Sequence, residues 1–232
     1  MEIAVLIPAR DEATAIAATV SAALSIPGVT RVTVVDDGSQ DDTDQLAEHA
    51  GAKVVRLHGS HGKGAALEAG ARRIEDADIV LLLDGDLGES ASQGALLLAP
   101  LLAGTADMTI ASFPRPTTKA GFGLVKSLAR FGITHLGGDF AATAPLSGQR
   151  ALTRSCLATV RPFSAGYGVE VGLTIRALRA DFVLAEVETT MSHSATGRNL
   201  AGFVHRGRQF VHVTLALIAL WHQKTPVRRE YS

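Results

Sequence analysis

The sequence predicts an α/β protein with a mainly parallel sheet flanked by helices. Before residue 84, four short apolar segments alternate with three longer segments of helical composition. This alternation is typical of βαβ units, whose strands run parallel and are joined by right-handed crossovers. With 232 residues, the chain is long enough to bury one substantial core, so we expect a single domain over 1–232.

The first half holds the most regular pattern. Apolar runs bounded by turn-forming residues predict strands, and the segments between them predict helices. The expected strands are 3–7, 31–35, 53–57 and 78–83, and the expected helices are 13–24, 41–50 and 65–74. Two acidic residues, Asp11 and Glu12, are expected in the first turn of helix 13–24, where the helix dipole favours them.

The second half is less regular. A strand is expected at 107–112, a helix at 122–136, a loop or short strand at 144–150 and a helix at 151–160. A further helix ending near 178, a strand at 182–187 and a final helix at 200–222 complete the prediction.

Polar and charged loops follow the ends of the four early strands. They cover 8–12, 36–39, 58–64 and 84–86. Because the carboxyl ends of parallel strands share one edge of a sheet, and open α/β sheets bind ligands there, we expect these loops to form one site. The Walker pattern and the G-x-G-x-x-G pattern are both missing from them, which argues against a P-loop ATPase and an NAD dehydrogenase.

The strongest single signal is the pair Asp84 and Asp86, separated by Gly85 at the end of a buried strand. Carboxylate oxygens suit a hard divalent cation that also takes phosphate oxygens. Aspartates are also common in ordinary turns, so the pair alone leaves both interpretations open. The other loops at the same edge favour the metal site.

Charge and cysteine content narrow the class of protein. A net charge of −1 gives no general attraction to nucleic acid. The C-terminal segment 189–232 is basic, since Glu230 is its only acidic residue. A single cysteine, Cys156, excludes an internal disulfide, and the N-terminus lacks the pattern of a signal peptide. We therefore expect a cytoplasmic protein; peripheral contact of the basic C-terminal helix with the inner membrane face, and a homodimer, are left open.

Taken together, the loops resemble those of family 2 glycosyltransferases, which have the GT-A fold. The matching motifs are Ile-Pro-Ala-Arg-Asp-Glu (7–12), Val-Val-Asp-Asp-Gly-Ser (34–39), Gly-Lys-Gly (62–64) and Leu-Asp-Gly-Asp (83–86). Segments 145–148 and 162–173 are similar to the retaining glucosyl-3-phosphoglycerate synthases. The resemblance implies a Rossmann-like GT-A domain with a nucleotide-sugar-binding half (1–112) and an acceptor-binding half (113–232).

The resemblance also implies roles for individual residues. The donor, a nucleotide sugar such as UDP-glucose, would contact the first loop through its base, Asp37 through its base or ribose, and Lys63 through its uracil or diphosphate. Asp84 would contact the ribose or a metal-bound water. The metal, Mg²⁺ or Mn²⁺, would be ligated by Asp86 and His193. The complete set of implied nucleotide-sugar contacts is Pro8, Arg10, Glu12, Asp37, Lys63, Asp84, Tyr167 and Arg198.

Glu170, Leu146 and Asp86 are the implied catalytic residues. In inverting enzymes a carboxylate near Glu170 deprotonates the acceptor. In the retaining relatives it binds sugar hydroxyls, while a backbone carbonyl near Leu146 assists attack on the same face. The sequence leaves this choice open.

The resemblance is weakest in the residues that bind the acceptor. The synthases carry a Gly-Arg-x-Thr element, and the corresponding stretch here, 121–124 or 123–126, has neither the arginine nor the threonine. Lys119, Lys126 or Arg130 would have to replace them for a phosphorylated small-molecule acceptor. Two alternatives remain: a peripheral enzyme of the dolichol-phosphate-mannose synthase type with a lipid-phosphate acceptor, and a catalytically silent nucleotide-sugar-binding protein. A sugar-1-phosphate nucleotidyltransferase is disfavoured because the first loop lacks its G-x-G-x-R-x-x-P element.

Overall fold

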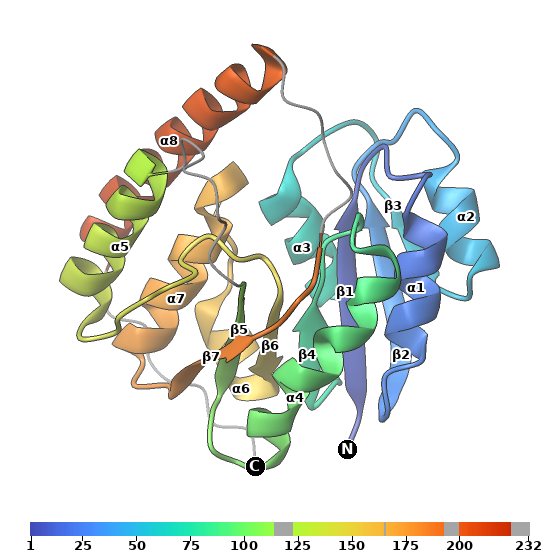
Figure 1. Cartoon of the computed structure of the whole chain (residues 1–232), viewed down its shortest axis with the longest axis horizontal. Coiled ribbons are helices and arrows are strands. Elements are labelled where there is room, and N and C mark those ends of the chain that lie inside the picture. The colour runs from blue at the N-terminus through green and yellow to red at the C-terminus, as the bar shows by residue number, and fades with distance from the viewer. Residues whose placement is uncertain (114–122, 165, 193–199, 224–232) are drawn as a thin grey trace.

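A seven-stranded sheet forms the centre of the computed structural model, which describes residues 1–113, 123–164, 166–192 and 200–223 (Figure 1). The strand order is β3-β2-β1-β4-β6-β5-β7. The strands are β1 (Ile3–Ala9), β2 (Val29–Asp36), β3 (Lys53–Arg56), β4 (Ile79–Leu82), β5 (Met108–Ser112), β6 (Arg150–Thr153) and β7 (Leu184–Glu188).

Six of these strands share one direction. Strands β1 to β4 pair in parallel, and β5 pairs in parallel with β7. Only β6 is reversed, and it joins the two groups by pairing antiparallel with both β4 and β5. The expected mainly parallel sheet is therefore confirmed. Strand β5, from the half 1–112, lies between β6 and β7 from the half 113–232, so one sheet unites both halves; their division of function stays a prediction.

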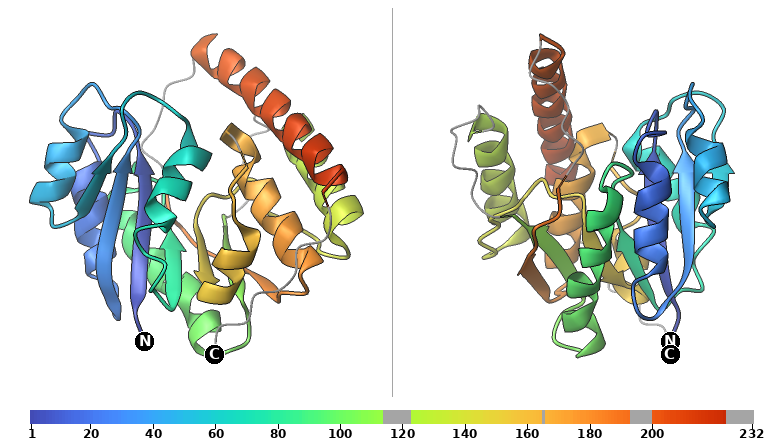
Figure 2. Two further views of the ribbon diagram at one scale, coloured as in Figure 1. Left: turned by 180° about the vertical axis from the view of Figure 1, so that it is seen from behind. Right: turned by 45° about the vertical axis from the view of Figure 1, so that its right-hand side comes forward.

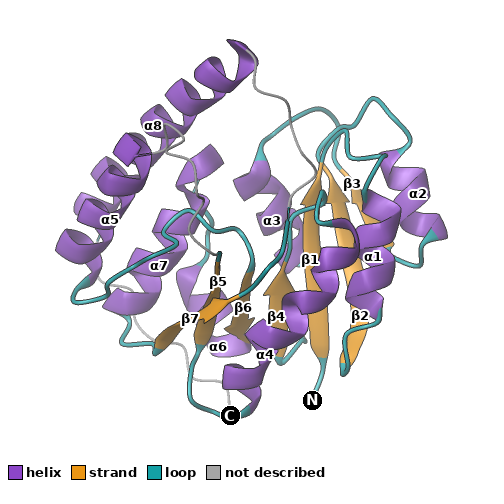
Figure 3. Cartoon of the chain, in the orientation of Figure 1, coloured by secondary structure: helices purple, strands orange, loops and turns teal. Residues whose placement is uncertain are grey.

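Helices cover both faces of the sheet (Figure 3). On one face α1 (Ile16–Leu24), α2 (Thr43–His49) and α4 (Gly94–Leu102) contribute to a shared apolar core. On the other face the core includes residues of α3 (Lys63–Ala71), α6 (Arg154–Val160) and α7 (Val169–Arg179). The sheet is thus buried on both sides, as parallel sheets require.

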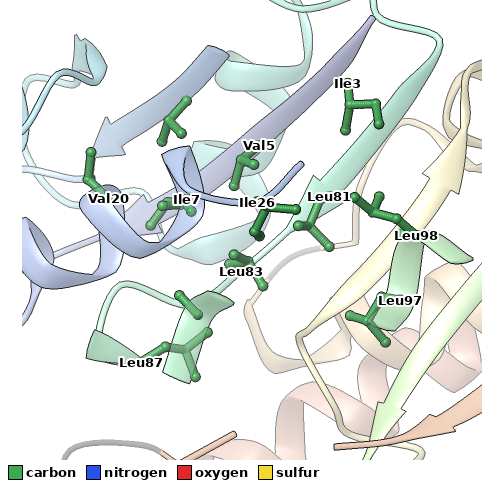
Figure 4. Packing of buried hydrophobic residues seen from close by; sticks show 14 of the residues in the cluster. Ile3, Val5, Ile7, Val20, Ile26, Leu81, Leu83, Leu87, Leu97 and Leu98 are labelled. Atoms are coloured by element: carbon green, nitrogen blue, oxygen red, sulfur yellow. The ribbon is translucent and has the colours of Figure 1, made fainter. Parts of the chain in front are cut away.

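Strand β1 shows how its sequence produces this arrangement. Ile3, Val5 and Ile7 point into the first core, and the residues between them, Ala4 and Leu6, point into the second. Figure 4 shows the first three beside the side chains of β4 and α4. Because successive strand residues face opposite sides, a strand buried on both faces is apolar throughout.

A third layer lies outside α7. The helices α5 (Gly123–Gly137) and α8 (Leu200–Trp221) pack on α7 and on each other around a small core that includes Ile133, Ile175 and Val213. Figure 2 shows α5 and α8 side by side at one end of the molecule. Gly132 allows their close approach, since a Cβ there would lie 2.2 Å from Cδ2 of Leu217.

Three sequence expectations differ from the structure. The predicted helix 151–160 begins only at Arg154, because the residues before it form β6 and alternate between the two cores. The segment 84–106, for which no regular element is expected, contains a 3-10 helix, η1 (Gly88–Gln93), and the apolar helix α4. Helix α1 starts at Ile16 and has no acidic residue in its first turn, so Asp11 and Glu12 belong to the loop before it.

Among the described residues, no helix combines the length and the apolar character needed to cross a bilayer.

Candidate active site

The loops at the carboxyl ends of the strands meet around Lys63. This residue opens α3, directly after the glycine-rich loop, and its Nζ lies 2.7 Å from Oδ1 of Asp84 at the end of β4. The same Nζ lies 2.9 Å from Oε1 of Glu170 in the first turn of α7. Residues from distant parts of the chain therefore form one carboxylate–ammonium–carboxylate cluster.

The lysine in this cluster remains charged. Burial alone would lower the pKa of Lys63, but the carboxylates of Asp84 and Glu170 raise it well above its ordinary value. Glu170 is itself buried, whereas Lys63 and Asp84 keep about a quarter of their side chains exposed. The site consequently holds a charged ammonium between two carboxylates at an accessible edge.

Two residues before β6 complete the cluster. Nε2 of Gln149, which is buried, donates to Oδ2 of Asp84 over 2.6 Å. A Cβ on Gly148 would lie 2.5 Å from Nζ of Lys63 and 3.0 Å from Oδ2 of Asp84, so the backbone passes directly over the ion pair. The sequence predicts a loop or short strand at 144–150 but does not single out Gln149, because its contact depends on how β6 pairs.

Carboxylates crowd together beside this cluster. Burial and the nearby carboxylates of Asp86 and Asp84 raise the pKa of Glu12 to about 7. A Cβ on Gly85 would lie 3.4 Å from Cγ of Glu12, so this glutamate sits over the turn between the two aspartates. The buried Thr19, which sequence reasoning missed, supports that turn by donating to the carbonyl of Gly85 over 2.9 Å.

Carboxylate oxygens of this kind are the donor type that a hard divalent cation takes. Negative charge is concentrated enough that a proton is retained near neutral pH, and a cation bound by the oxygen atoms would relieve the repulsion. Within the described ranges, no group of three or more His, Cys, Asp or Glu residues is placed to hold a metal ion. The second expected ligand, His193, lies outside the described residues.

The acidic segment 36–43 mainly organises the loops. The buried Asp37 accepts hydrogen bonds from the backbone N–H groups of His61 and Gly62, each over 2.8 Å, and thereby anchors the glycine-rich loop. Thr43 Oγ1 accepts from the backbone N–H of Glu12 over 2.8 Å, and Asp11 accepts from that of Gln40 over 2.8 Å. The first loop is therefore fastened to the second.

Three other residues that the sequence predicts for the site lie outside the cluster of Lys63, Asp84 and Glu170. Arg10 donates to Ser60, which joins the first loop to the glycine-rich loop. Pro8 lies in β1 beyond the last residue of that strand paired with β4, so its missing N–H disrupts no ladder on that side. Leu146 is half-buried and packs on the outer core of α5, α7 and α8.

Some expectations fall where the structure makes no statement. Arg198 and Lys119, like His193, are outside the described residues. Tyr167 lies in the short 3-10 helix η2 (Gly166–Gly168), and its side chain is not described. Arg130 is described, and its guanidinium donates to the carbonyls of Ala142 and Thr143.

The site and the fold agree with the comparisons to known proteins. The family model for glycosyl transferase family 2 matches residues 4–145. That range contains the first loop, the glycine-rich loop and the Asp84–Asp86 turn. The chain belongs to glycosyl transferase family 2. Its mixed sheet with flanking helices is the GT-A fold of the solved relatives.

Individual relatives are about one-third identical to this family 2 chain over the aligned residues. It is 33% identical over 196 residues to the glycosyltransferase AglJ of Haloferax volcanii, covering 81% of this chain and 62% of that protein. It is 34% identical over 197 residues to a glucosyl-3-phosphoglycerate synthase of Mycolicibacterium paratuberculosis, covering 75% and 59%. The chain therefore spans about three fifths of the length of these two relatives.

Solved structures extend the likeness to nearly the whole chain. The glucosyl-3-phosphoglycerate synthase of Mycobacterium tuberculosis in complex with Mg²⁺ and UDP superposes with a TM-score of 0.77 at 27% identity, covering 94% of this chain and 79% of that one. The same synthase in complex with Mn²⁺, UDP-glucose and phosphoglyceric acid gives a TM-score of 0.76 at 28% identity, with the same coverage.

Proposed function

We propose that this protein is a metal-dependent glycosyltransferase that moves a hexose from a nucleotide-diphosphate sugar, with UDP-glucose as donor, to a phosphorylated acceptor. The observation that carries the proposal is the cluster of Lys63, Asp84 and Glu170 beside the Asp84–Asp86 turn. It combines a permanent cation with oxygen ligands at the edge where open α/β sheets bind nucleotides. The solved relatives named above, which bind UDP, UDP-glucose, Mg²⁺ and Mn²⁺, support the same assignment.

The residues of the site have separate roles in donor binding. The first loop, with Pro8, Arg10 and Glu12, receives the base, while Asp37 holds the glycine-rich loop in place. The ammonium of Lys63 offsets negative charge on the leaving diphosphate. Bound at Asp86 and His193, Mg²⁺ or Mn²⁺ would act as a Lewis acid that spreads the same charge.

Acceptor attack takes place on the Glu170 side of the cluster. Because Glu170 is buried and ion-paired with Lys63, its carboxylate faces the lysine that we assign to the donor diphosphate rather than solvent. This arrangement favours the binding of sugar hydroxyls by Glu170, with the carbonyl of Leu146 assisting on the same face. Tyr167 and Arg198 are proposed as further donor contacts on the basis of the motifs alone.

The contacts of Arg130 narrow the choice of residues for binding an acceptor phosphate. Its guanidinium is used to hold the carbonyls of Ala142 and Thr143. Of the three basic residues that the sequence suggests for an acceptor phosphate, we therefore propose Lys119 and Lys126. Phosphoglyceric acid, which is bound together with UDP-glucose in a solved relative, is accordingly one member of a panel of acceptors to be tested rather than the assigned substrate.

The test is a transfer assay. The protein is incubated with Mn²⁺, UDP-glucose or another UDP-, GDP- or ADP-sugar, and a panel of phosphorylated acceptors, and nucleotide release and glycosylated product are measured by mass spectrometry. We expect transfer from one donor that is lost in Asp86→Asn. A matched control is Asp78→Asn, just before β4 and at the opposite edge, which should keep transfer. Donor-independent or absent turnover would refute the proposal.

Exposed apolar side chains on α8 favour a second candidate, transfer to a polyprenyl phosphate at a membrane surface. Val211, Leu215, Ile218 and Trp221 are all at least half exposed. Trp221 is the only tryptophan of the chain, so its fluorescence emission reports burial of this face.

A blue shift of the Trp221 emission on adding anionic vesicles would support membrane contact. A shift that depends on protein concentration without vesicles would support a homodimer, and no shift would argue against both. The cytoplasmic location also stays a prediction.

A further inference from the structure

An arginine lies in the middle of the sheet, below the site. Arg150 opens β6, where it pairs with Leu82 of β4 and Ile110 of β5, and it is completely buried. Burial lowers its pKa to about 10, against the opposing effect of the Glu170 carboxylate. A buried cation is costly unless it is well paired, so its presence here needs a reason.

The hydrogen bonds of Arg150 join two parts of the active site. Its Nε donates to the carbonyl of Ser147 over 2.9 Å, and its Nη1 donates to Oγ1 of Thr174 over 2.9 Å. The Thr174 hydroxyl in turn donates to the carbonyl of Glu170 over 3.0 Å. One side chain therefore connects the loop before β6 with the first turn of α7.

Both connected parts contact Lys63 or its partner. The loop carries Gly148, which passes over Lys63, and Gln149, which donates to Asp84. The first turn of α7 carries Glu170, the second carboxylate bound to Lys63. The spacing between these groups consequently depends on the relative position of the loop and the helix, which Arg150 sets.

Stability alone is a poor explanation for this arrangement. Nη2 of Arg150 has no hydrogen-bond partner in the part of the chain that the structure describes, although it is buried. Replacing buried ionic groups by well-packed apolar ones is often neutral or stabilising. A purely structural position between two apolar strands would be better filled by methionine or leucine.

We propose that Arg150 is a positioning residue for glycosyl transfer. It holds the loop 146–149 and the first turn of α7 at a fixed separation, so that Lys63 stays between Asp84 and Glu170. The proposal rests on the proposed function, because it concerns the geometry of the same site. It does not require Arg150 to touch either substrate.

The main test compares Arg150→Met with Arg179→Met. Arg179 is a half-buried arginine on α7 that also binds backbone carbonyls, those of Leu136 and Leu220, but away from the site. We expect Arg150→Met to lower kcat by about 100-fold, as a misplacement of about 1 Å can, with KM for the donor and Tm little changed. Arg179→Met should lower Tm and leave kcat unchanged.

Two further variants keep the test decisive if Arg150→Met does not fold. Thr174→Val removes only the hydrogen bonds of the Thr174 hydroxyl, which link Arg150 to α7, and should lower kcat by a smaller factor than Arg150→Met. Arg150→Lys keeps a cation with fewer donor directions and should restore part of the activity. Wild-type kcat in Arg150→Met, or in Thr174→Val if only that variant folds, would overturn the proposal.

Hydrogen–deuterium exchange separates this inference from the proposed function. In Arg150→Met we expect faster exchange in peptides covering 144–149 and 169–174, and no change in β1 or α1. If the wild-type protein transfers no sugar but this exchange pattern appears, the proposed function fails, and the pattern shows only that Arg150 holds the loop and the helix together. If the wild type is active and Arg150→Met changes neither kcat nor the exchange of these peptides, the positioning role is wrong.

Discussion

Gly148→Ala would disturb the ion pairs of the site without disturbing the fold. The new Cβ would lie 2.5 Å from Nζ of Lys63, and ordinary contact starts at 3.4 Å, so the ammonium must retreat. The φ of Gly148 is outside the left-handed region, so alanine is allowed there. Because the displaced atom is the end of a flexible side chain, the steric cost is small, and we expect the free energy of unfolding to fall by about 1 to 2 kcal/mol, which is the loss in the ion pair.

The loss at the site follows from the distances. Lengthening the Lys63–Asp84 separation from 2.7 Å by about 1 Å weakens the attraction by about 1 to 2 kcal/mol at an effective dielectric constant of about 20. A loss of that size in the transition state lowers kcat/KM by about 10-fold. The assay is steady-state transfer from UDP-glucose, with Tm measured in parallel.

Gly137→Ala is the matched control. Its Cβ would lie 2.8 Å from Cδ1 of Leu178, again the end of a flexible side chain, but far from the ion pairs. It should lower Tm slightly and leave kcat/KM unchanged. Wild-type kcat/KM in Gly148→Ala would refute the argument that the backbone sets the position of Lys63.

Three further predictions concern stability. Burial raises the pKa of Glu68, but hydrogen bonds from Arg161 outweigh that effect, so the pKa lies below its ordinary value. The ion pair therefore stabilises the fold above about pH 4.3. In urea unfolding, the difference in unfolding free energy between wild type and Glu68→Gln should shrink as the pH falls below that value. Because the pKa of Glu12 is raised from 4.5 to about 7, the folded protein binds more protons than the unfolded chain between these pH values. Its unfolding free energy should therefore fall as the pH rises from 4.5 to about 7. The unfolding free energy of Glu12→Gln should depend less on pH, and a pH dependence equal to that of the wild type would contradict the raised pKa. Gly132→Ala should destabilise the protein by about 1 to 3 kcal/mol through the clash with Leu217 while leaving UDP binding intact, as calorimetry can establish.

The early strands and their edge could be predicted from the sequence because their signals are local. Each of β1 to β4 contains at least two consecutive apolar residues, and parallel connection places the loops after them at one edge. The rule places Lys63 and Asp84 at the same edge, but β2 and β1 lie between β3 and β4, so it does not predict that the two residues touch. The boundaries differ by a few residues, as with α1, since loop residues before a helix can share its composition.

The inner side of the site could not be predicted in the same way. Gln149 and Arg150 reach their positions because β6 inserts antiparallel between β4 and β5, a pairing that a strand of four residues does not reveal. Glu170 is recognised only by resemblance, since nothing in its local sequence indicates that α7 directs it toward Lys63. Thr19 supports Gly85 from a helix whose buried face shows no polar pattern.

The most direct test of the central claim is a calorimetric titration of the protein with UDP, with and without Mn²⁺, for the wild type and Asp86→Asn. If the edge formed by Lys63, Asp84 and Asp86 is a metal-dependent donor site, the wild type binds UDP tightly only with Mn²⁺ and the variant loses that enhancement. Equal UDP affinity with and without Mn²⁺, or no UDP binding at all, would contradict the account.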